Sequence, residues 1–198
     1  MNRKIIKTTP FGSVGIIWTA LNSDPKIVRV LLSRPDLSAE ERLFQLYLNS
    51  AISTCAEIDL VAAAIQGFLE GDEIDIPLDV ADWSVCSPFQ KSVLRAESGI
   101  PRGSVSTYKL IAEQVGKHNG ARAVGTALAR NPFPLIVPCH RAIRSDRHLG
   151  GYQGGLKMKR ALLDMEGVPF DDADRVVCEQ FYYDQGSRVG EPRSAEGN

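Results

Sequence analysis

Three segments near the amino terminus are rich in Ile and Val and are separated by turn residues. They run from Lys4 to Thr8, from Val14 to Leu21 and from Lys26 to Ser33, with Phe11-Gly12 and Asn22-Ser23-Asp24-Pro25 between them. Apolar, β-branched runs bounded by Gly, Pro, Asn and Asp are typical of strands joined by turns. The pattern predicts a small antiparallel meander.

Two helices are predicted to follow, each from a capping signature. Ser38 with Glu41, and Thr54 with Glu57, match the S-x-x-E capping box, in which side chains satisfy backbone groups of the first turn. The apolar residues of the second helix recur at helical spacing: Ile58, Val61, Ala62, Ile65, Phe68 and Leu69. Gly71 stands where a carboxy-terminal cap belongs. We expect one face of this helix to pack on the meander.

An acidic stretch then predicts a domain boundary. It runs from Asp72 to Asp82 and contains a proline, which favours an extended connection. Beyond it, Ser87-Pro88-Phe89-Gln90 predicts a helix that begins with a capping Ser, a Pro at the first position and a Gln able to complete the box, and Gly99 closes this helix. We expect an α+β protein with a sheet-and-helix domain at residues 1–82 and a helical domain at residues 83–170.

The helical domain has the pattern of a helix-turn-helix. Apolar positions at helical spacing mark its first helix: Tyr108, Ile111, Ala112 and Val115. Gly116 ends this stripe, and after a short turn Asn119 can cap a further helix that runs through Ala129. Such a pair of helices is either a DNA-binding unit or a pair that only packs a core.

The rest of the chain is irregular apart from one helix. Residues 130–148 contain three prolines, and four glycines surround Tyr152, so both stretches are predicted to be loops. Gly167 ends the last helix, which has one apolar side formed by Met158, Ala161, Leu162 and Met165. Residues 171–198 are acidic and polar, which predicts a disordered tail.

The composition is that of a folded soluble protein. Of the 198 residues, 43% are hydrophobic and 24% are charged. No apolar run approaches the roughly 18 residues that cross a bilayer, so no membrane span is predicted. Thr8, Thr9 and Pro10 interrupt what would be the apolar core of a signal peptide. We expect a cytoplasmic protein, or a nuclear one if the source is eukaryotic.

The cysteines predict neither disulfides nor a metal site. They are scattered, and none belongs to a C-x-x-C pair; they are Cys55, Cys86, Cys139 and Cys178. Four thiols in a chain of this length are typical of a reducing compartment, where each is either a small buried group or a reactive one.

The net charge of -1 conceals a basic middle segment. Residues 88–168 hold 13 Lys and Arg against five Asp and Glu, whereas the segments on either side are acidic. An asymmetry of this kind suggests an anionic partner for the middle segment, with nucleic acid first. The alternative is a solvated basic face without a partner.

One cysteine lies in a context that points to chemistry. Cys139 stands between Pro138 and His140 after an apolar run. A thiol becomes a good nucleophile as the thiolate, which a neighbouring base favours. His140 is a candidate base, and Glu166 a carboxylate that could assist it. The alternative is an inert buried thiol beside a structural histidine, because adjacent residues need not contact each other.

The second helix of the predicted helix-turn-helix consists mostly of residues with small side chains. It reads Gly120-Ala-Arg-Ala-Val-Gly-Thr-Ala-Leu-Ala129, with Arg122 its only charge. Glycine inside a helix costs about 1 kcal/mol relative to alanine, so something should require the small size of Gly125. That requirement is either helix packing or close approach to a DNA groove, with Arg122 entering the duplex.

Taken together, residues 86–168 resemble one family, the methylated-DNA protein-cysteine methyltransferases, also called alkylguanine-DNA alkyltransferases. The resemblance is carried by Pro88-Phe89-Gln90, Ile100-Pro101-Arg102-Gly103, Thr107-Tyr108, Ala121-Arg122-Ala123-Val124-Gly125, Asn131-Pro132, Val137-Pro138-Cys139-His140-Arg141, Gly151-Tyr152-Gln153-Gly154-Gly155 and Leu162-Leu163-Asp164-Met165-Glu166-Gly167. It implies a monomeric, single-turnover repair enzyme without metal or cofactor. Such a protein binds duplex DNA through the minor groove, flips an alkylated guanine and accepts the alkyl group irreversibly.

The resemblance also implies roles for individual residues. Cys139 would accept the alkyl group, His140 would deprotonate it through a water, and Glu166 would orient His140. Asn131 would hold the turn that carries the cysteine, and Tyr108 would help rotate the nucleotide and donate a proton toward the departing base.

Further roles concern the DNA and the flipped base. Arg122 would fill the gap in the base stack, and the small residues Ala121, Ala123 and Gly125 would allow the helix to approach the minor groove. Tyr152 would pack on the flipped base and the backbone of Gln153 would face O6. The carbonyls of Cys139 and Ala142 would accept from the guanine amino group.

Two other functions compete with this one. A non-catalytic protein that binds alkylation damage and recruits repair factors would carry another residue at the acceptor position, and Cys139 argues against it. A helix-turn-helix regulator with a structural cysteine would bind specific sequences without transferring an alkyl group.

Overall fold

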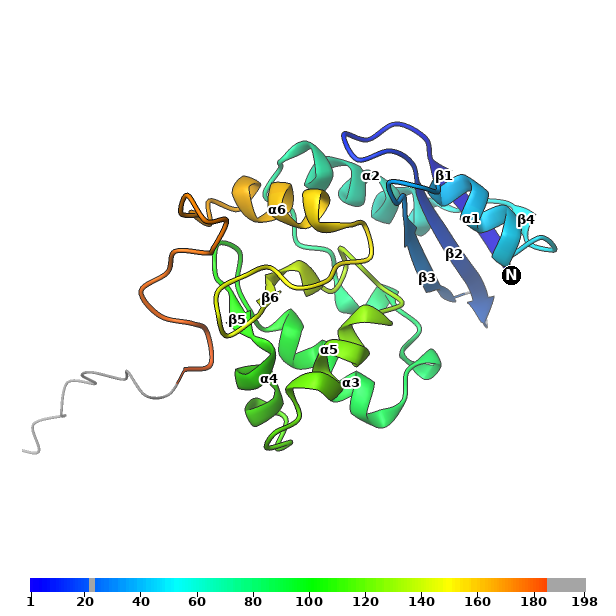
Figure 1. The fold of residues 1–198 in the computed structure, drawn as a ribbon. Helices are drawn as coiled ribbons and strands as arrows, with labels where there is room; N and C mark the ends of the chain where they lie inside the picture. Colours follow the sequence, from blue (N-terminus) through cyan, green and yellow to red (C-terminus); the bar gives the residue numbers. More distant parts are fainter. Residues whose placement is uncertain (22–23, 185–198) are drawn as a thin grey trace, which may run out of the picture.

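The computed structural model describes residues 1–21 and 24–184, and shows a small sheet beside a group of short helices (Figure 1). The predicted turn at Asn22 and Ser23 and the predicted tail beyond residue 184 lie outside the described residues. Among the helices that are described, none is long and apolar enough to cross a membrane.

The amino-terminal sheet has the predicted antiparallel strands and one more. Strands β1 (Asn2–Ile6), β2 (Val14–Leu21) and β3 (Asp24–Leu32) form the meander, and the two-residue β4 (Ala51–Ile52) pairs in parallel with β1. The order across the sheet is β3-β2-β1-β4. The prediction of a small antiparallel sheet is therefore confirmed.

Two helices accompany the sheet, and only the first begins as predicted. Helix α1 (Ala39–Leu46) has the full capping box between Ser38 and Glu41. Helix α2 (Ala56–Glu70) begins after Cys55 without a side-chain cap. The second predicted box is wrong because the Thr54 hydroxyl donates to the carboxylate of Asp59 at 2.5 Å. Helix α2 ends at Gly71, whose φ of 108° is the left-handed conformation that glycine favours.

The core runs through both halves of the chain. All six predicted core residues of α2 are buried, and they share one apolar cluster with Ile16 of β2, Val93 of the second half and Leu162 near the end. A backbone hydrogen bond also joins the halves at β3, from Val30 to Pro132 at 2.8 Å, and Asp82 at the end of the first half donates to Ile27 at 2.8 Å. The sheet is thereby held against the segment that carries the chemistry.

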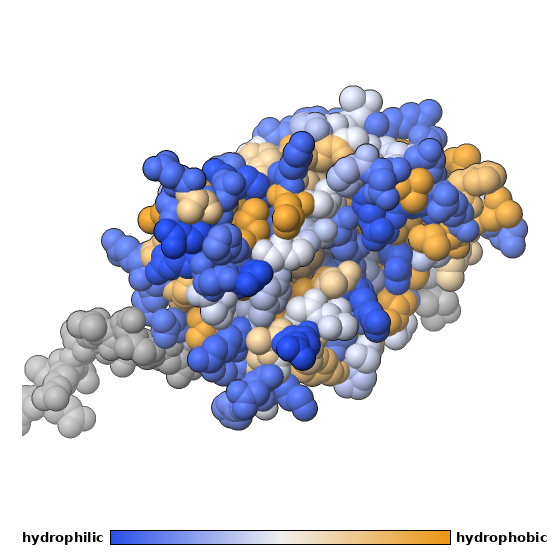
Figure 2. All heavy atoms as spheres, in the orientation of Figure 1, coloured by the Kyte–Doolittle hydropathy of each residue, from blue (hydrophilic) through white to orange (hydrophobic). Residues whose placement is uncertain are grey.

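The sheet end of the molecule exposes apolar side chains. They lie on α1, on β4 and on the segment between them, and include Phe44, Leu46, Leu48 and Ile52. Figure 2 shows apolar residues gathered at this end of the molecule, away from α6 and the carboxy-terminal segment. No part of the site described below is drawn from this surface.

The connection between the halves is not fully extended. It forms two short 3₁₀ turns, η1 (Leu78–Val80) and η2 (Trp83–Val85), before α3 (Pro88–Ser98) begins at Ser87 as predicted. The Gln90 side chain does not complete the capping box. It donates instead to the carbonyls of Ala127 and Arg130 at 3.1 Å each, which fixes α3 to the end of α5.

The helix-turn-helix is present as α4 (Tyr108–Gln114) and α5 (Ala121–Ala129). Gly116 lies in the turn with a φ of 70°. Asn119 is not the cap that we predicted, because α5 begins after Gly120 and Asn119 itself takes a positive φ of 59°. The turn is thus shaped by backbone conformation and not by a capping side chain.

The last part of the domain, from the proline-rich stretch onward, is built from short elements. The proline-rich stretch is irregular, as predicted, up to the 3₁₀ turn η3 (Cys139–Arg141). Strand β6 (Ala142–Ile143) pairs in parallel with β5 (Ser106–Thr107). Helix α6 (Leu156–Met165) follows, and Gly167 closes it with a φ of 81°.

The buried face of α6 differs from the predicted one. It consists of Met158, Lys159, Leu162 and Leu163. The predicted Ala161 and Met165 are only partly buried. The buried face of α6 thus includes the charged side chain of Lys159 and leaves Ala161 and Met165 at its edge.

Residues 171–184 are packed on the domain, which corrects the prediction of disorder for this part of the tail. Val176 is 1% exposed and joins an apolar cluster with Val105, Ile143 and Leu163. The backbone of Tyr182 pairs with Val105, and its carbonyl accepts from Ser106 at 2.6 Å. Val176 anchors this segment to a neighbouring surface, while most of the other residues at 171–184 stay exposed or partly exposed.

Candidate active site

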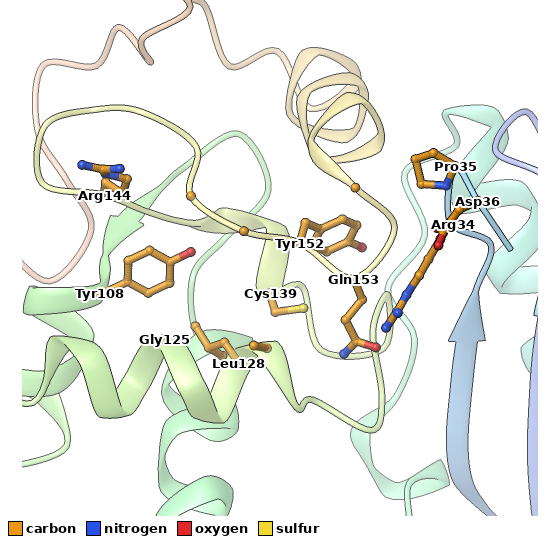
Figure 3. A pocket seen from close by; sticks show the side chains of 14 residues that line it. Arg34, Pro35, Asp36, Tyr108, Gly125, Leu128, Cys139, Arg144, Tyr152 and Gln153 are labelled. Atoms are coloured by element: carbon orange, nitrogen blue, oxygen red, sulfur yellow. The ribbon is translucent and has the colours of Figure 1, made fainter. Parts of the chain in front are cut away.

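A cavity of about 720 Å³ opens between the two halves of the molecule, and Cys139 lines it (Figure 3). Its walls come from α5 through Gly125, from the glycine loop through Tyr152 and from the β3–α1 turn through Arg34. Cys139 is 5% exposed. The thiol is therefore shielded from bulk solvent and yet accessible to a molecule that enters the cavity.

The turn that carries Cys139 is held by Asn131. The Asn131 side-chain oxygen accepts from the backbone of Phe133 at 2.9 Å, and its amide nitrogen donates to the carbonyl of Val137 at 3.4 Å. These two bonds tie the start of the proline-rich loop to its end, directly before Pro138.

Behind the cysteine lies a buried group of His140, Arg141 and Glu166. His140 Nε2 lies 2.8 Å from Glu166 Oε1. Arg141 donates to the same carboxylate from Nε at 3.0 Å and from Nη2 at 2.8 Å, and to the carbonyl of Ile100 at 2.7 Å. A carboxylate accepts from Nε2–H, which leaves Nδ1 as the basic nitrogen. Nδ1 is buried and has no hydrogen-bond partner among the described residues.

The surroundings decide which of these groups carries charge. Burial raises the pKa of Cys139 to about 12, against the hydrogen bond from Asn131. Burial also lowers the pKa of His140, against the attraction of Glu166. Burial alone would raise the pKa of Glu166, but the hydrogen bonds from His140 and Arg141 outweigh it and lower the value to about 2. The resting site therefore consists of a thiol, a neutral imidazole and a carboxylate.

Two tyrosines flank the cysteine. Tyr108 begins α4 and points its hydroxyl into the cavity toward the glycine loop (Figure 3). Its pKa is raised to about 12, first by burial and then by the charge of Glu97. The Tyr152 ring lies edge-on to the His140 ring, with 6.3 Å between centroids, and its buried hydroxyl has no partner among the described residues. Both phenols therefore keep their protons at neutral pH.

The two other predicted substrate-contact residues, Gln153 and Ala142, differ in their access to the cavity. Gln153 lines the cavity, and its side chain donates to the carbonyl of Asn131 at 2.6 Å. Ala142 is completely buried, and its carbonyl already accepts from the Lys159 ammonium at 2.6 Å. The Ala142 carbonyl is therefore already engaged by a buried cation.

Helix α5 presents the predicted small residues outward. Arg122 and Ala123 are exposed, and Ala121 and Gly125 are partly exposed. A Cβ atom added at Gly125 would meet no other atom within 4 Å. Helix packing within the described chain therefore does not require this glycine.

Three parts of the site were missed by sequence reasoning. Arg34 and Asp36 reach the cavity from the amino-terminal half, which no local pattern could show. Arg141 belongs to the Pro-Cys-His-Arg motif, but the motif alone does not show that its side chain holds Glu166. Lys159 had a signal, because Lys159, Leu162 and Glu166 follow helical spacing on one buried face of the chain. Among the described residues, no group of three or more His, Cys, Asp or Glu could hold a metal ion.

The structure combines a helix-turn-helix with a cavity that contains a cysteine and a buried His–Glu pair. This is the arrangement of a DNA-binding protein with a reactive cysteine. The family model described as the DNA-binding domain of 6-O-methylguanine DNA methyltransferase matches residues 88–168. The methylated-DNA–protein-cysteine methyltransferase of Methanothermobacter thermautotrophicus is 40% identical over 162 residues, which are 82% of this chain and 84% of that protein. The chain therefore belongs to the family of methylated-DNA–protein-cysteine methyltransferases.

Solved structures agree with this assignment. The crystal structure of Mycobacterium tuberculosis OGT in complex with DNA has a TM-score of 0.64 and 28% identity, and the match covers 84% of this chain and 92% of that one. The O6-methylguanine-DNA methyltransferase of Pyrococcus kodakaraensis has a TM-score of 0.63 and 25% identity, with 84% and 99% covered. The mixed α+β fold is thus the fold of these proteins.

Proposed function

We propose that this protein repairs duplex DNA by moving a methyl or other alkyl group from guanine O6 to the sulfur of Cys139. The observation that carries the proposal is the position of Cys139, which lines a cavity in front of the His140–Glu166 pair. The transfer is irreversible, so each chain acts once. The family's name agrees with this chemistry.

The reaction needs a base for the thiol because the resting thiol is neutral. His140 Nδ1 takes the thiol proton through a water, and Glu166 stabilises the imidazolium that forms. The sulfur attacks the alkyl carbon, a carbon–sulfur bond forms and the bond from carbon to O6 breaks. The electron pair stays on the guanine, which takes a proton from Tyr108. The products are a thioether and an intact guanine.

The flipped guanine is held by groups around the cavity. Tyr152 packs on the base, and the Gln153 backbone faces O6. The carbonyls of Cys139 and Ala142 accept from the exocyclic amino group. Flipping a base costs a few kcal/mol, and less when its pairing is already weakened by alkylation. The site thereby favours damaged bases.

The DNA is bound through α5 in the minor groove. Ala121, Ala123 and Gly125 let the helix approach closely, and Arg122 enters the stack where the guanine was. The minor groove shows a degenerate pattern, which suits an enzyme that must act on any sequence. The basic segment at residues 88–168 supplies phosphate contacts, so binding should weaken steeply with salt. The protein acts as a monomer.

The test is the mass of the intact protein after incubation with a duplex that contains O6-methylguanine. We expect one added methyl group per chain, located on Cys139, with no turnover and no added cofactor. A Cys139→Ala variant should bind the duplex and gain no mass. A folded sample that binds damaged DNA but leaves Cys139 unmodified would instead identify a damage-binding protein, and sequence-specific binding without transfer would identify a regulator.

A further inference from the structure

Two ionisable side chains that the reaction above does not use are completely buried beside the site. Glu97 on α3 and Lys159 on α6 are both 0% exposed. The carboxyl oxygens of Glu97 make no well-formed hydrogen bond among the described residues. Burial raises the Glu97 pKa, and the nearby Ala142 backbone opposes this only in part. An ionised carboxylate in such a place carries a large desolvation cost, so the enclosure favours the neutral acid form of Glu97 at neutral pH.

Lys159 lies directly beneath the catalytic turn. Its ammonium donates to the carbonyl of Ala142 at 2.6 Å and to that of Leu149 at 2.5 Å. Ala142 follows η3, and Leu149 precedes the glycine loop that lines the cavity. The ammonium also lies 5.8 Å from the centre of the Tyr108 ring. The Lys159 ammonium therefore contacts both the segment after η3 and the segment before the glycine loop.

Glu97 and Lys159 act on the same groups with opposite signs. The groups that interact with the Glu97 charge lie on four neighbouring segments: Lys159 of α6, Arg141 and Cys139 of η3, Tyr108 of α4 and Tyr183 of the carboxy-terminal segment. Burial is the main reason why the pKa of Cys139 is high; a Glu97 carboxylate raises it further, whereas the Lys159 ammonium lowers it. Burial is the main reason why the pKa of His140 is low, and the Lys159 charge lowers it a little further.

Both groups titrate just above neutral pH. Burial raises the pKa of Glu97 to about 8 and is opposed by the positive charge of Lys159. Burial lowers the pKa of Lys159 to about 8. At neutral pH the carboxyl is therefore mostly protonated while the ammonium is mostly charged. The pair as a whole then carries one positive charge.

We propose that Glu97 is a positioning residue for alkyl transfer: as a neutral acid it leaves the Lys159 ammonium uncompensated beneath Cys139, and its ionisation in mild base cancels that charge and slows the transfer. The physical reason is that a positive charge nearby stabilises the thiolate that forms when His140 removes the proton. This inference rests on the proposed function, because it concerns the same cysteine. It predicts that the reaction slows in mild base, although a reaction limited only by thiol ionisation would accelerate.

The experiment compares single-turnover methyl transfer in the wild type and in Glu97→Gln from about pH 6.5 to pH 9. The amide resembles the protonated acid and cannot ionise. We expect equal rates at pH 6.5. Toward pH 9 both proteins lose the Lys159 charge, but only the wild type also gains the Glu97 carboxylate, so the variant should be about threefold faster there. The matched control, Glu57→Gln on the exposed side of α2, should follow the wild type at every pH. A ratio of Glu97→Gln to wild type that does not change with pH overturns the inference.

A second measurement keeps the inference testable if Glu97→Gln does not fold. Infrared spectra of the wild-type protein labelled with ¹³C in the glutamate side chains report protonated carboxyls directly. We expect a buried protonated carboxyl at pH 7 that is lost by about pH 9.5, and its absence at pH 7 would refute the inference. Failure of the proposed function looks different, because the wild type would then gain no methyl group at any pH.

Discussion

His140 Nε2 lies 2.8 Å from Glu166 Oε1, and both side chains are buried, at 0% and 8% exposure. This contact fixes which imidazole nitrogen is basic. It also places a carboxylate where it can stabilise the imidazolium without facing the substrate. The adjacent Arg141 holds the same carboxylate from its other side.

Replacing Glu166 by Gln should slow methyl transfer about a hundredfold, because the imidazole loses both its orientation and the charge that favours its protonated form. The measurement is the single-turnover rate with an O6-methylguanine duplex at neutral pH. Duplex affinity should stay within about twofold, because Glu166 lies behind the cysteine. An unchanged rate in a folded variant would remove Glu166 from the mechanism.

The same carboxylate should stabilise the fold in a defined pH range. Its pKa is about 2 in the folded protein against an ordinary value of 4.5, so its stabilisation is complete above about pH 5 and is lost as the pH falls toward 2. The loss corresponds to about 3 kcal/mol. Urea unfolding of the wild type and of Glu166→Gln between pH 2 and pH 7 tests this. The difference between the two should shrink in acid; a constant difference contradicts the prediction.

Gly125 should be needed for DNA binding and not for stability. A Cβ there meets no atom within 4 Å, so Gly125→Ala should stabilise α5 by up to about 1 kcal/mol. Gly125→Leu should fold normally and bind duplex DNA about tenfold or more weakly, because its bulk blocks the approach of the helix. Thermal unfolding and fluorescence anisotropy separate the two effects. Loss of stability in both variants would restore the packing explanation.

Arg122 should matter for flipping and not for the chemistry. It is exposed on α5, outside the residues that line the cavity. Arg122→Ala should slow transfer from a duplex about tenfold to a hundredfold, because nothing then fills the gap left by the guanine. Transfer from the free base O6-methylguanine should be unchanged. Equal losses with both substrates would show that Arg122 acts through the fold.

Local patterns predicted most of the elements because those patterns act over a few residues. The strands, the buried face of α2, the start of α3 at Ser87 and the helix-turn-helix all depend on short-range periodicity and turn chemistry. Three predicted helix caps were wrong, in each case because of the folded chain around them. Thr54, Asn119 and Gln90 each had a suitable capping side chain, but competing contacts or backbone conformations in the folded chain decided otherwise. Residues 171–184 were predicted to be disordered because their partner surface lies far away in the sequence.

By itself, the sequence supplied the candidate residues for the chemistry: a cysteine beside a histidine, a small-residue helix with one arginine, and a carboxylate in a matching motif. Only the tertiary structure decided that His140 and Glu166, 26 residues apart, are in contact, that Arg34 reaches the same cavity as Cys139, and that Glu97 and Lys159 are enclosed beneath it. The reason is physical. Residue type sets the chemistry that a group is able to perform, whereas its charge state and its partners depend on desolvation and distance, which packing alone determines.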